Sequence, residues 1–210
     1  MILIGMLDSP FVRRVAISLT LLDLPFEHRS WSVGKDFDRI REHSPLGRVP
    51  VLVLDDGEAV LDSPTILDHL DDRVGPDRAL LPAGGAPRRA ALHAIALAIG
   101  AVEKGLQIVG ERVFRPADRR HPPYVDRCAT QVAGALTALD RLAAAAGDRP
   151  WLAGDRIGQV DVTVGCVLAY LRDAVPLDLA PYPTLRARSA AYEALPVFAR
   201  HYLPFDAPVP

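Results

Sequence analysis

One stretch of the sequence decides the fold, and it reads Val49-Pro50-Val51-Leu52-Val53-Leu54-Asp55-Asp56-Gly57-Glu58-Ala59-Val60-Leu61-Asp62-Ser63-Pro64. The apolar run 49–54 predicts a buried strand, since strand-forming residues fill it. Residues 55–58 predict a hairpin turn, because Asp and Gly tolerate positive φ, and residues 59–61 supply the return strand. The final tripeptide Asp62-Ser63-Pro64 then opens a helix that we expect over residues 63–73.

The same tripeptide occurs earlier as Asp8-Ser9-Pro10, again after an apolar run. Ser is a favoured N-cap and Pro is favoured at the first helical position, so we expect a strand over residues 2–6 and a helix over residues 10–22. A helix N-terminus carries free N–H groups and about half a positive charge, which favours anions. If the fold brings the two helix starts together, they make one site with room for a thiolate and a carboxylate.

The organisation of the chain changes near residue 76. Up to that point strands and helices alternate in the order β-α-β-α-β-β-α, with a second strand over 25–29 and a weak helix over 35–43. Residues 77–87 are rich in Pro and Gly and predict a linker. We expect the remainder, residues 88–210, to be an all-helical domain behind an α/β domain over 1–76. The expected helices cover 88–114, 124–146, 157–172, 184–195 and 197–202.

The composition is that of an ordinary globular protein, with 210 residues and a net charge of -2. The sequence has no clustered basic stripe, so we expect no binding to nucleic acid. We see no apolar run long enough for a bilayer and no basic signal-peptide region, so we expect no membrane association and a cytoplasmic location. The two cysteines, Cys128 and Cys166, lie in apolar helical surroundings that favour reduced thiols. The six histidines are scattered, which predicts no metal site.

Four segments of the chain together resemble one known family. They are Ser9-Pro10-Phe11-Val12-Arg13-Arg14-Val15, Gly47-Arg48-Val49-Pro50-Val51-Leu52, Leu61-Asp62-Ser63-Pro64-Thr65-Ile66, and Trp151-Leu152-Ala153-Gly154-Asp155-Arg156-Ile157 with Val160-Asp161. In this order they resemble the cytosolic glutathione S-transferases over nearly the whole chain. The resemblance implies a thioredoxin-like N-terminal domain, a helical C-terminal domain, a homodimer, and glutathione as the co-substrate.

Ser9 stands where the family places its thiol-activating residue. The resemblance implies that its hydroxyl donates a hydrogen bond to the glutathione sulfur and lowers the pKa of the thiol. The alternative is that Ser9 only caps its helix, because one hydroxyl cannot easily fill both roles. Residues 1–48 contain neither Cys nor Tyr, so a covalent mixed disulfide with glutathione is disfavoured.

The other matching motifs imply a glutathione-binding surface. A cis bond between Val49 and Pro50 would expose the main chain of Val49 to the cysteinyl part of the ligand, whereas a trans bond would simply begin a strand. Ser63 suits the γ-glutamyl carboxylate and Asp62 suits the ammonium group beside it. A plain capping pair fits these two residues equally well.

Four cationic side chains lie in or near these motifs. Lys35 and Arg48 are candidates for the glycyl carboxylate or the ligand backbone. Arg13 and Arg14 lie on the first predicted helix. For all four, solvated surface charge is the favoured interpretation.

The resemblance places an acceptor site for the electrophile between the two domains. Its wall would include Leu7, Phe11, Ile99, Glu103 and Gln107, and the many small apolar residues suggest an apolar electrophile. Asp161 has a structural interpretation instead, because it stands three residues after Gly158 and can complete a capping box.

We therefore expect a glutathione transferase. Two alternatives remain open: a non-catalytic binding or interaction protein with the same fold, and a glutathione-dependent isomerase or dehalogenase. The lack of a Ser-Ser-Cys motif before the first helix argues against the maleylacetoacetate isomerase branch.

Overall fold

The computed structural model describes residues 1–175 and 177–205, which form two compact units. Unit 1 contains residues 1–83 and the segment 195–203, and unit 2 contains residues 84–194 and the described residues after 203. The segment 195–203 thus groups with unit 1, although the sequence places it with the helical domain. Residues 206–210 of the Pro-rich tail lie outside the described residues.

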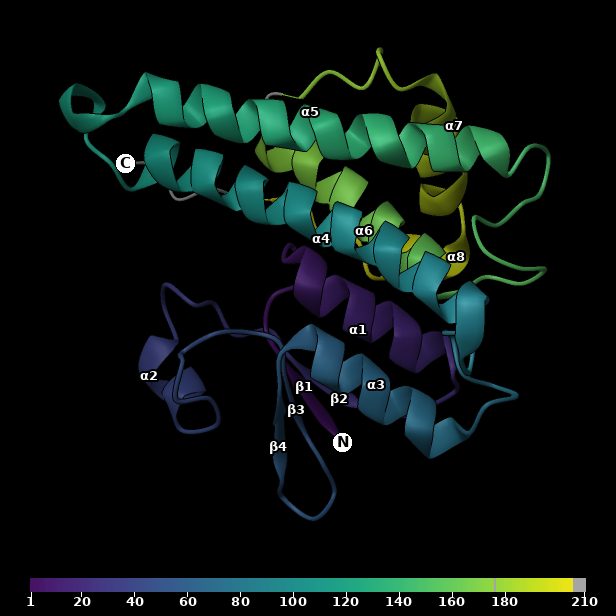
Figure 1. Ribbon diagram of the computed structural model, residues 1–210. Helices are drawn as coiled ribbons and strands as arrows, with labels where there is room; N and C mark the ends of the chain where they lie inside the picture. The colour runs from purple at the N-terminus through teal and green to yellow at the C-terminus, as the bar shows by residue number, and fades with distance from the viewer. Residues whose placement is uncertain (176, 206–210) are drawn as a thin grey trace. The chain divides into compact units, whose positions relative to one another are not determined.

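Unit 1 is built on a mixed four-stranded sheet in the order β2-β1-β3-β4. The strands are β1 (Ile2–Ile4), β2 (Glu27–Arg29), β3 (Val51–Val53) and β4 (Ala59–Leu61). β1 runs parallel to β2 and antiparallel to β3, and β3 pairs with β4 as a hairpin. With helices α1 (Pro10–Leu21), α2 (Phe37–Arg41) and α3 (Ser63–Val74), this gives the expected order β-α-β-α-β-β-α (Figure 1).

Helices cover both faces of this sheet. Val15 and Leu19 of α1 and Leu70 of α3 are buried against one face, where α1 and α3 lie side by side (Figure 1). Ile40 of α2 is buried with Ile4 against the opposite face. The burial of these apolar rows follows the helical spacing of the sequence. The last helix of the unit, α8 (Pro196–Arg200), packs against α1.

Unit 2 is all helical within its described residues, and its two long helices run antiparallel (Figure 1). Its helices are α4 (Gly85–Val113), the short 3-10 helix η1 (Ala117–Arg119), α5 (Pro122–Ala145), α6 (Gln159–Ala174) and α7 (Pro183–Glu193). α4 begins inside the stretch 77–87 that the sequence predicts as a linker. Gly105 lets α4 approach α6, because a Cβ there would lie 2.6 Å from a methyl carbon of Leu171.

Helix α4 is also long and apolar enough to cross a membrane, judged by length and composition alone. This corrects the expectation that no such apolar run exists. The helix packs against α5 and α6, and one helix of this kind is weak evidence for a membrane span.

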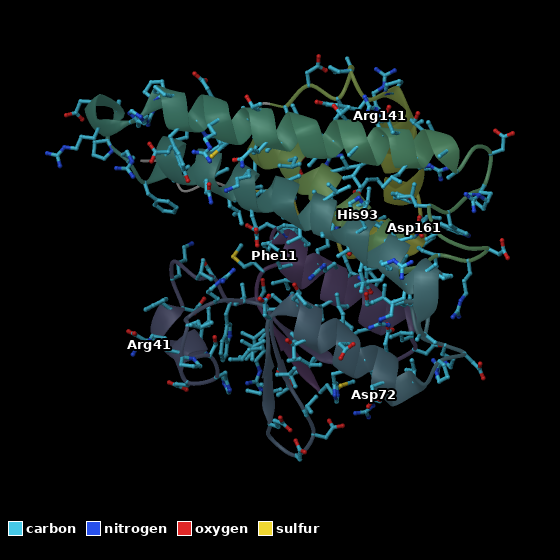
Figure 2. The ribbon with its side chains drawn as sticks, in the orientation of Figure 1. Phe11, Arg41, Asp72, His93, Arg141 and Asp161 are labelled. Atoms are coloured by element: carbon cyan, nitrogen blue, oxygen red, sulfur yellow. The ribbon has the colours of Figure 1, made fainter. Side chains whose placement is uncertain are left out.

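Asp161 holds the start of α6 in place (Figure 2). Its carboxylate accepts hydrogen bonds from the N–H of Gly158 at 3.0 Å, the N–H of Leu152 at 2.8 Å and the hydroxyl of Tyr192 at 2.7 Å. Gly158 has no side chain to complete a reciprocal box. Burial raises the pKa of the Asp161 carboxyl, and these donors act against that rise. The structural interpretation of Asp161 is therefore confirmed.

Candidate functional site

The pairing register of unit 1 gathers three loops at one end of the sheet. Ile4 at the end of β1 pairs with Val51 at the start of β3, and Val51 pairs with Leu61 at the end of β4. The chain therefore leaves β1 toward Ser9, enters β3 from Pro50 and leaves β4 toward Asp62 along the same edge. The two Asp-Ser-Pro motifs and the Val-Pro motif flank this edge, so the structure fulfils the condition under which the two helix starts can form one site.

The peptide bond between Val49 and Pro50 is cis, as predicted. Val49 packs against Gly5, where an added Cβ would lie 2.8 Å from the Cβ of Val49. Gly5 also has a φ of +133°, which disfavours other residues. No described residue forms a hydrogen bond with the main-chain N–H or C=O of Val49. These groups are free to pair with an extended ligand.

Ser9 is the N-cap residue of α1 and Pro10 is its first helical residue, as expected. The main-chain oxygen of Ser9 accepts the first helical bond, from Arg13 N at 2.9 Å. Within the described first turn, however, no N–H donates to the Ser9 hydroxyl. Ser9 is half-buried, and its hydroxyl does not cap the helix. It is therefore available to a ligand at the positive end of the helix.

The second motif begins its helix at Ser63, as predicted, but its N-cap residue differs from the expected serine. Asp62, not Ser63, is the N-cap of α3, and its carboxylate accepts the N–H of Ser63 at 2.7 Å. Asp62 is exposed and has a φ of 64°, an unusual backbone conformation for a residue other than glycine. Such residues often occur at ligand clamps.

Ser63 accepts a hydrogen bond from a residue of α1, Arg14. The Nη2 of Arg14 donates a hydrogen bond of 2.7 Å to Ser63 Oγ, and both side chains are buried. The expectation of a solvated Arg14 is therefore wrong. Residues 12–19 of α1 are all buried. The apolar residues on either side of the two arginines in the sequence were the available signal of that burial.

Arg13 is buried as well, which corrects the second of these expectations. Its guanidinium donates to the main-chain oxygens of Phe198 at 2.9 Å and His201 at 3.1 Å. Arg13 therefore links α1 to α8, and its side chain is not solvated.

Lys35 and Arg48 are both exposed, as surface cations are. Neither side chain forms an ion pair or hydrogen bond with a described residue. Arg48 directly precedes Val49 and so lies beside the sheet edge. Lys35 lies in the turn before α2, where its N–H bonds to Ser32 O at 3.2 Å. Their role toward a ligand stays a prediction.

The predicted acceptor residues belong to different units. Leu7 lies in the turn before α1, Phe11 lies in the first turn of α1 (Figure 2), and both are half-buried. Ile99, Glu103 and Gln107 lie on α4. Gln107 Oε1 accepts hydrogen bonds from Tyr124 at 2.6 Å and Lys104 at 3.3 Å, so this oxygen takes part in holding α4 to α5. A common acceptor wall stays a prediction.

No cluster of His, Cys, Asp and Glu that would hold a metal ion occurs among residues 1–175 and 177–205. Cys128 and Cys166 form no disulfide with each other, and both are buried. At the start of α1, Ser9 offers a hydroxyl and not a thiol.

The mixed four-stranded sheet with its helices and the cis-proline define a thioredoxin-like class of protein, and comparison with known families identifies the family. Residues 3–78 match the model of the glutathione S-transferase N-terminal domain, and residues 93–202 match that of the C-terminal domain. The chain belongs to the glutathione S-transferase family. Unit 1 contains its thioredoxin-like domain together with α8, and unit 2 carries α4 to α7 of its helical C-terminal domain.

Solved structures and a curated relative extend the comparison. A glutathione S-transferase from Methylobacterium radiotolerans, in complex with glutathione sulfonate, is 33% identical with a TM-score of 0.90, covering 100% of this chain and 97% of that one. One from Methylobacillus flagellatus with glutathione bound is 27% identical with a TM-score of 0.87, covering 97% and 99%. The maleylacetoacetate isomerase of Pseudomonas aeruginosa is 30% identical over 192 residues, which cover 88% of this chain and 87% of the isomerase.

Proposed function

We propose that this chain is a glutathione transferase that joins the glutathione thiolate to a small, apolar electrophile. The observation that carries the proposal is the state of Ser9. Its hydroxyl stands at the positive end of α1 and accepts no bond from the described N–H groups of the first turn. A hydroxyl in that position can donate to a sulfur anion.

The ligand is proposed to lie along the sheet edge. Its γ-glutamyl group binds at Asp62 and Ser63, its cysteinyl main chain pairs with Val49 beside Pro50, and its thiol lies at Ser9. Support comes from the shared edge and from the unpaired main chain of Val49 within the described residues. Two related structures contain glutathione or its sulfonate. Lys35 and Arg48 are proposed to attract the glycyl carboxylate.

The chemistry follows from the sulfur. The thiol loses its proton to solvent, and the α1 dipole and the Ser9 hydroxyl stabilise the thiolate. The thiolate then forms a bond to an electrophilic carbon, and a leaving group departs with the electron pair of the broken bond. The protein contributes orientation and electrostatic stabilisation. The acceptor wall is proposed to include Leu7, Phe11, Ile99, Glu103 and Gln107.

The test is a conjugation assay with a generic aryl halide and glutathione, alongside calorimetric binding of glutathione. We expect binding by wild type and by Ser9→Ala, and a conjugation rate at least about tenfold lower for Ser9→Ala. The control is Ser189→Ala, a buried serine of unit 2 outside the proposed site. Glutathione binding without conjugation of any of several electrophiles contradicts the transferase proposal.

A second candidate is a glutathione-dependent isomerase. The 30% identity to the isomerase of Pseudomonas aeruginosa favours it, whereas the lack of a Ser-Ser-Cys motif before α1 argues against that branch. An isomerase or dehalogenase regenerates glutathione, whereas a conjugating enzyme consumes it. A mass balance of free glutathione over many turnovers separates them. Absent glutathione binding favours the non-catalytic alternative.

The assembly and location are also proposals. We infer a cytoplasmic homodimer, as the family resemblance implies. Sedimentation equilibrium at micromolar concentration tests the dimer, and a monomeric mass contradicts it.

A further inference from the structure

We propose that Arg14 is a positioning residue that sets the direction of the Ser63 hydroxyl for carboxylate recognition. The inference rests on the proposed function, because it deepens the γ-glutamyl end of the same site. Arg14 itself is not proposed to touch the ligand. It acts through Ser63, whose hydroxyl oxygen accepts its hydrogen bond.

The contact fixes which partner donates. A guanidinium has only N–H donors, so Ser63 Oγ must accept the 2.7 Å bond from Arg14 Nη2. A hydroxyl that accepts this bond keeps its own proton for a second partner. Ser63 is thereby left as a donor, which is what an incoming carboxylate needs.

The setting of the contact makes that direction permanent. Arg14 is 2% exposed and Ser63 is 0% exposed. An arginine stays protonated at every accessible pH, so it never becomes an acceptor for the Ser63 proton. A neutral donor such as Gln could rotate its amide and offer an oxygen instead.

The neighbouring residue shows why the hydroxyl matters. The N–H of Ser63 already donates to the Asp62 carboxylate at 2.7 Å. The hydroxyl proton of Ser63 is therefore the donor that this residue still has for a ligand. The positive charge of Arg14 behind it also favours an anion.

The alternative is a purely structural role, in which Arg14 only joins α1 to α3. The two roles differ in what they do to ligand discrimination. A structural defect weakens every glutathione-like ligand alike. A positioning defect weakens the ligand that carries the α-carboxylate and spares the one that lacks it.

The experiment measures binding of two ligands by calorimetry: glutathione, and γ-aminobutyryl-cysteinyl-glycine, which is glutathione without the α-carboxylate. We expect wild type to prefer glutathione, and Arg14→Gln to reduce the ratio of the two affinities by about tenfold. Arg14→Lys keeps a donor and a charge, so it should restore part of the ratio. Ser63→Ala should reduce the ratio too, and adding Arg14→Gln to it should cause little further change.

The matched control is Arg13→Gln, which removes the adjacent buried arginine of the same helix. It should lower stability and leave the affinity ratio unchanged. If Arg14→Gln still binds glutathione and its affinity ratio equals that of wild type, the positioning role of Arg14 is overturned, but the proposed function is not. If Arg14→Gln does not fold, the ratio in Arg14→Lys decides, and a wild-type ratio there overturns the role. Absent glutathione binding by wild type overturns the proposed function as well.

Discussion

The guanidinium of Arg13 donates a hydrogen bond of 2.9 Å to the main-chain oxygen of Phe198, which lies 185 residues later in the chain. The same group lies 5.7 Å from the centre of the Phe198 ring and 5.1 Å from that of Tyr202. A buried cation on the last carbonyls of a short helix acts as its C-terminal cap. Arg13 therefore fastens α8 to the sheet unit.

We predict that Arg13→Gln lowers the free energy of unfolding by about 2 kcal/mol or more, because two buried carbonyls lose a charged donor. Urea denaturation followed by circular dichroism measures this. Arg172→Gln is the control, since Arg172 is exposed and pairs with Asp173 on the surface. That pair is worth less than about 1 kcal/mol. Equal losses in the two variants contradict the assignment.

The side chain of His201, next to the Arg13 contact, makes the stability of this region pH-dependent. Its Nε2 lies 2.8 Å from Thr20 Oγ1, whose own proton goes to Ala16 O, so the neutral imidazole donates through Nε2. Burial lowers the pKa of His201 to about 4, and the positive charges of Arg200 and Arg13 and the nearby His28 add to the effect.

The sign of the resulting pH dependence follows from this lowered pKa. The unfolded chain binds a proton at His201 near pH 6.5 and the folded chain near pH 4. Stability is therefore full above pH 6.5 and is lost as the pH falls toward 4, by up to about 3 kcal/mol. His201→Gln should reduce the slope of unfolding free energy against pH in that window. A slope identical to wild type means that His201 is not the titrating group.

Local patterns predicted the elements of the chain well, and the reason is physical. Apolar spacing alone places α1 to within one residue of its observed end, and the Asp-Gly turn places β3 and β4. The register of the strands was not predicted, and so the meeting of the two Asp-Ser-Pro motifs at one edge remained a condition that the structure fulfils.

The side-chain partners of the site were not predictable in the same way. The burial of Arg13 and Arg14 depends on Phe198 and Ser63, which lie far along the chain. The N-cap of α3 is Asp62 rather than Ser63, because the Asp62 carboxylate accepts the N–H of Ser63. Long-range contacts decide such choices, and a single sequence carries no direct signal of them.

Gly5 provides a test of the packing under Val49. A Cβ at Gly5 would lie 2.6 Å from Val12 Cγ2 and 2.8 Å from Val49 Cβ. At Gly57, which also has a positive φ of 92°, no described atom lies within 4 Å. We predict that Gly5→Ala costs about 2 kcal/mol more than Gly57→Ala and weakens glutathione binding. Equal unfolding midpoints and equal glutathione affinities for the two variants contradict this.

The two helix starts should respond differently to loss of their side chains. Ser9→Ala should change the unfolding free energy by less than about 0.5 kcal/mol, because its hydroxyl receives no bond from the described N–H groups of α1. Asp62→Ala should cost about 1 kcal/mol, because Asp62 does cap α3. Thermal unfolding of both variants measures this difference. A larger loss for Ser9→Ala than for Asp62→Ala reverses the assignment.

The pKa of the glutathione thiol in the complex tests the central claim most directly. Thiolate absorbance of the complex is followed against pH for wild type and for Ser9→Ala, at saturating glutathione. A free thiol of this type has a pKa of about 8.5. We predict a value at least about one unit lower in the wild-type complex, and a shift back toward 8.5 in Ser9→Ala, about 1.4 kcal/mol per unit. A bound thiol with the same pKa in both proteins contradicts the assignment of Ser9 as the activating residue.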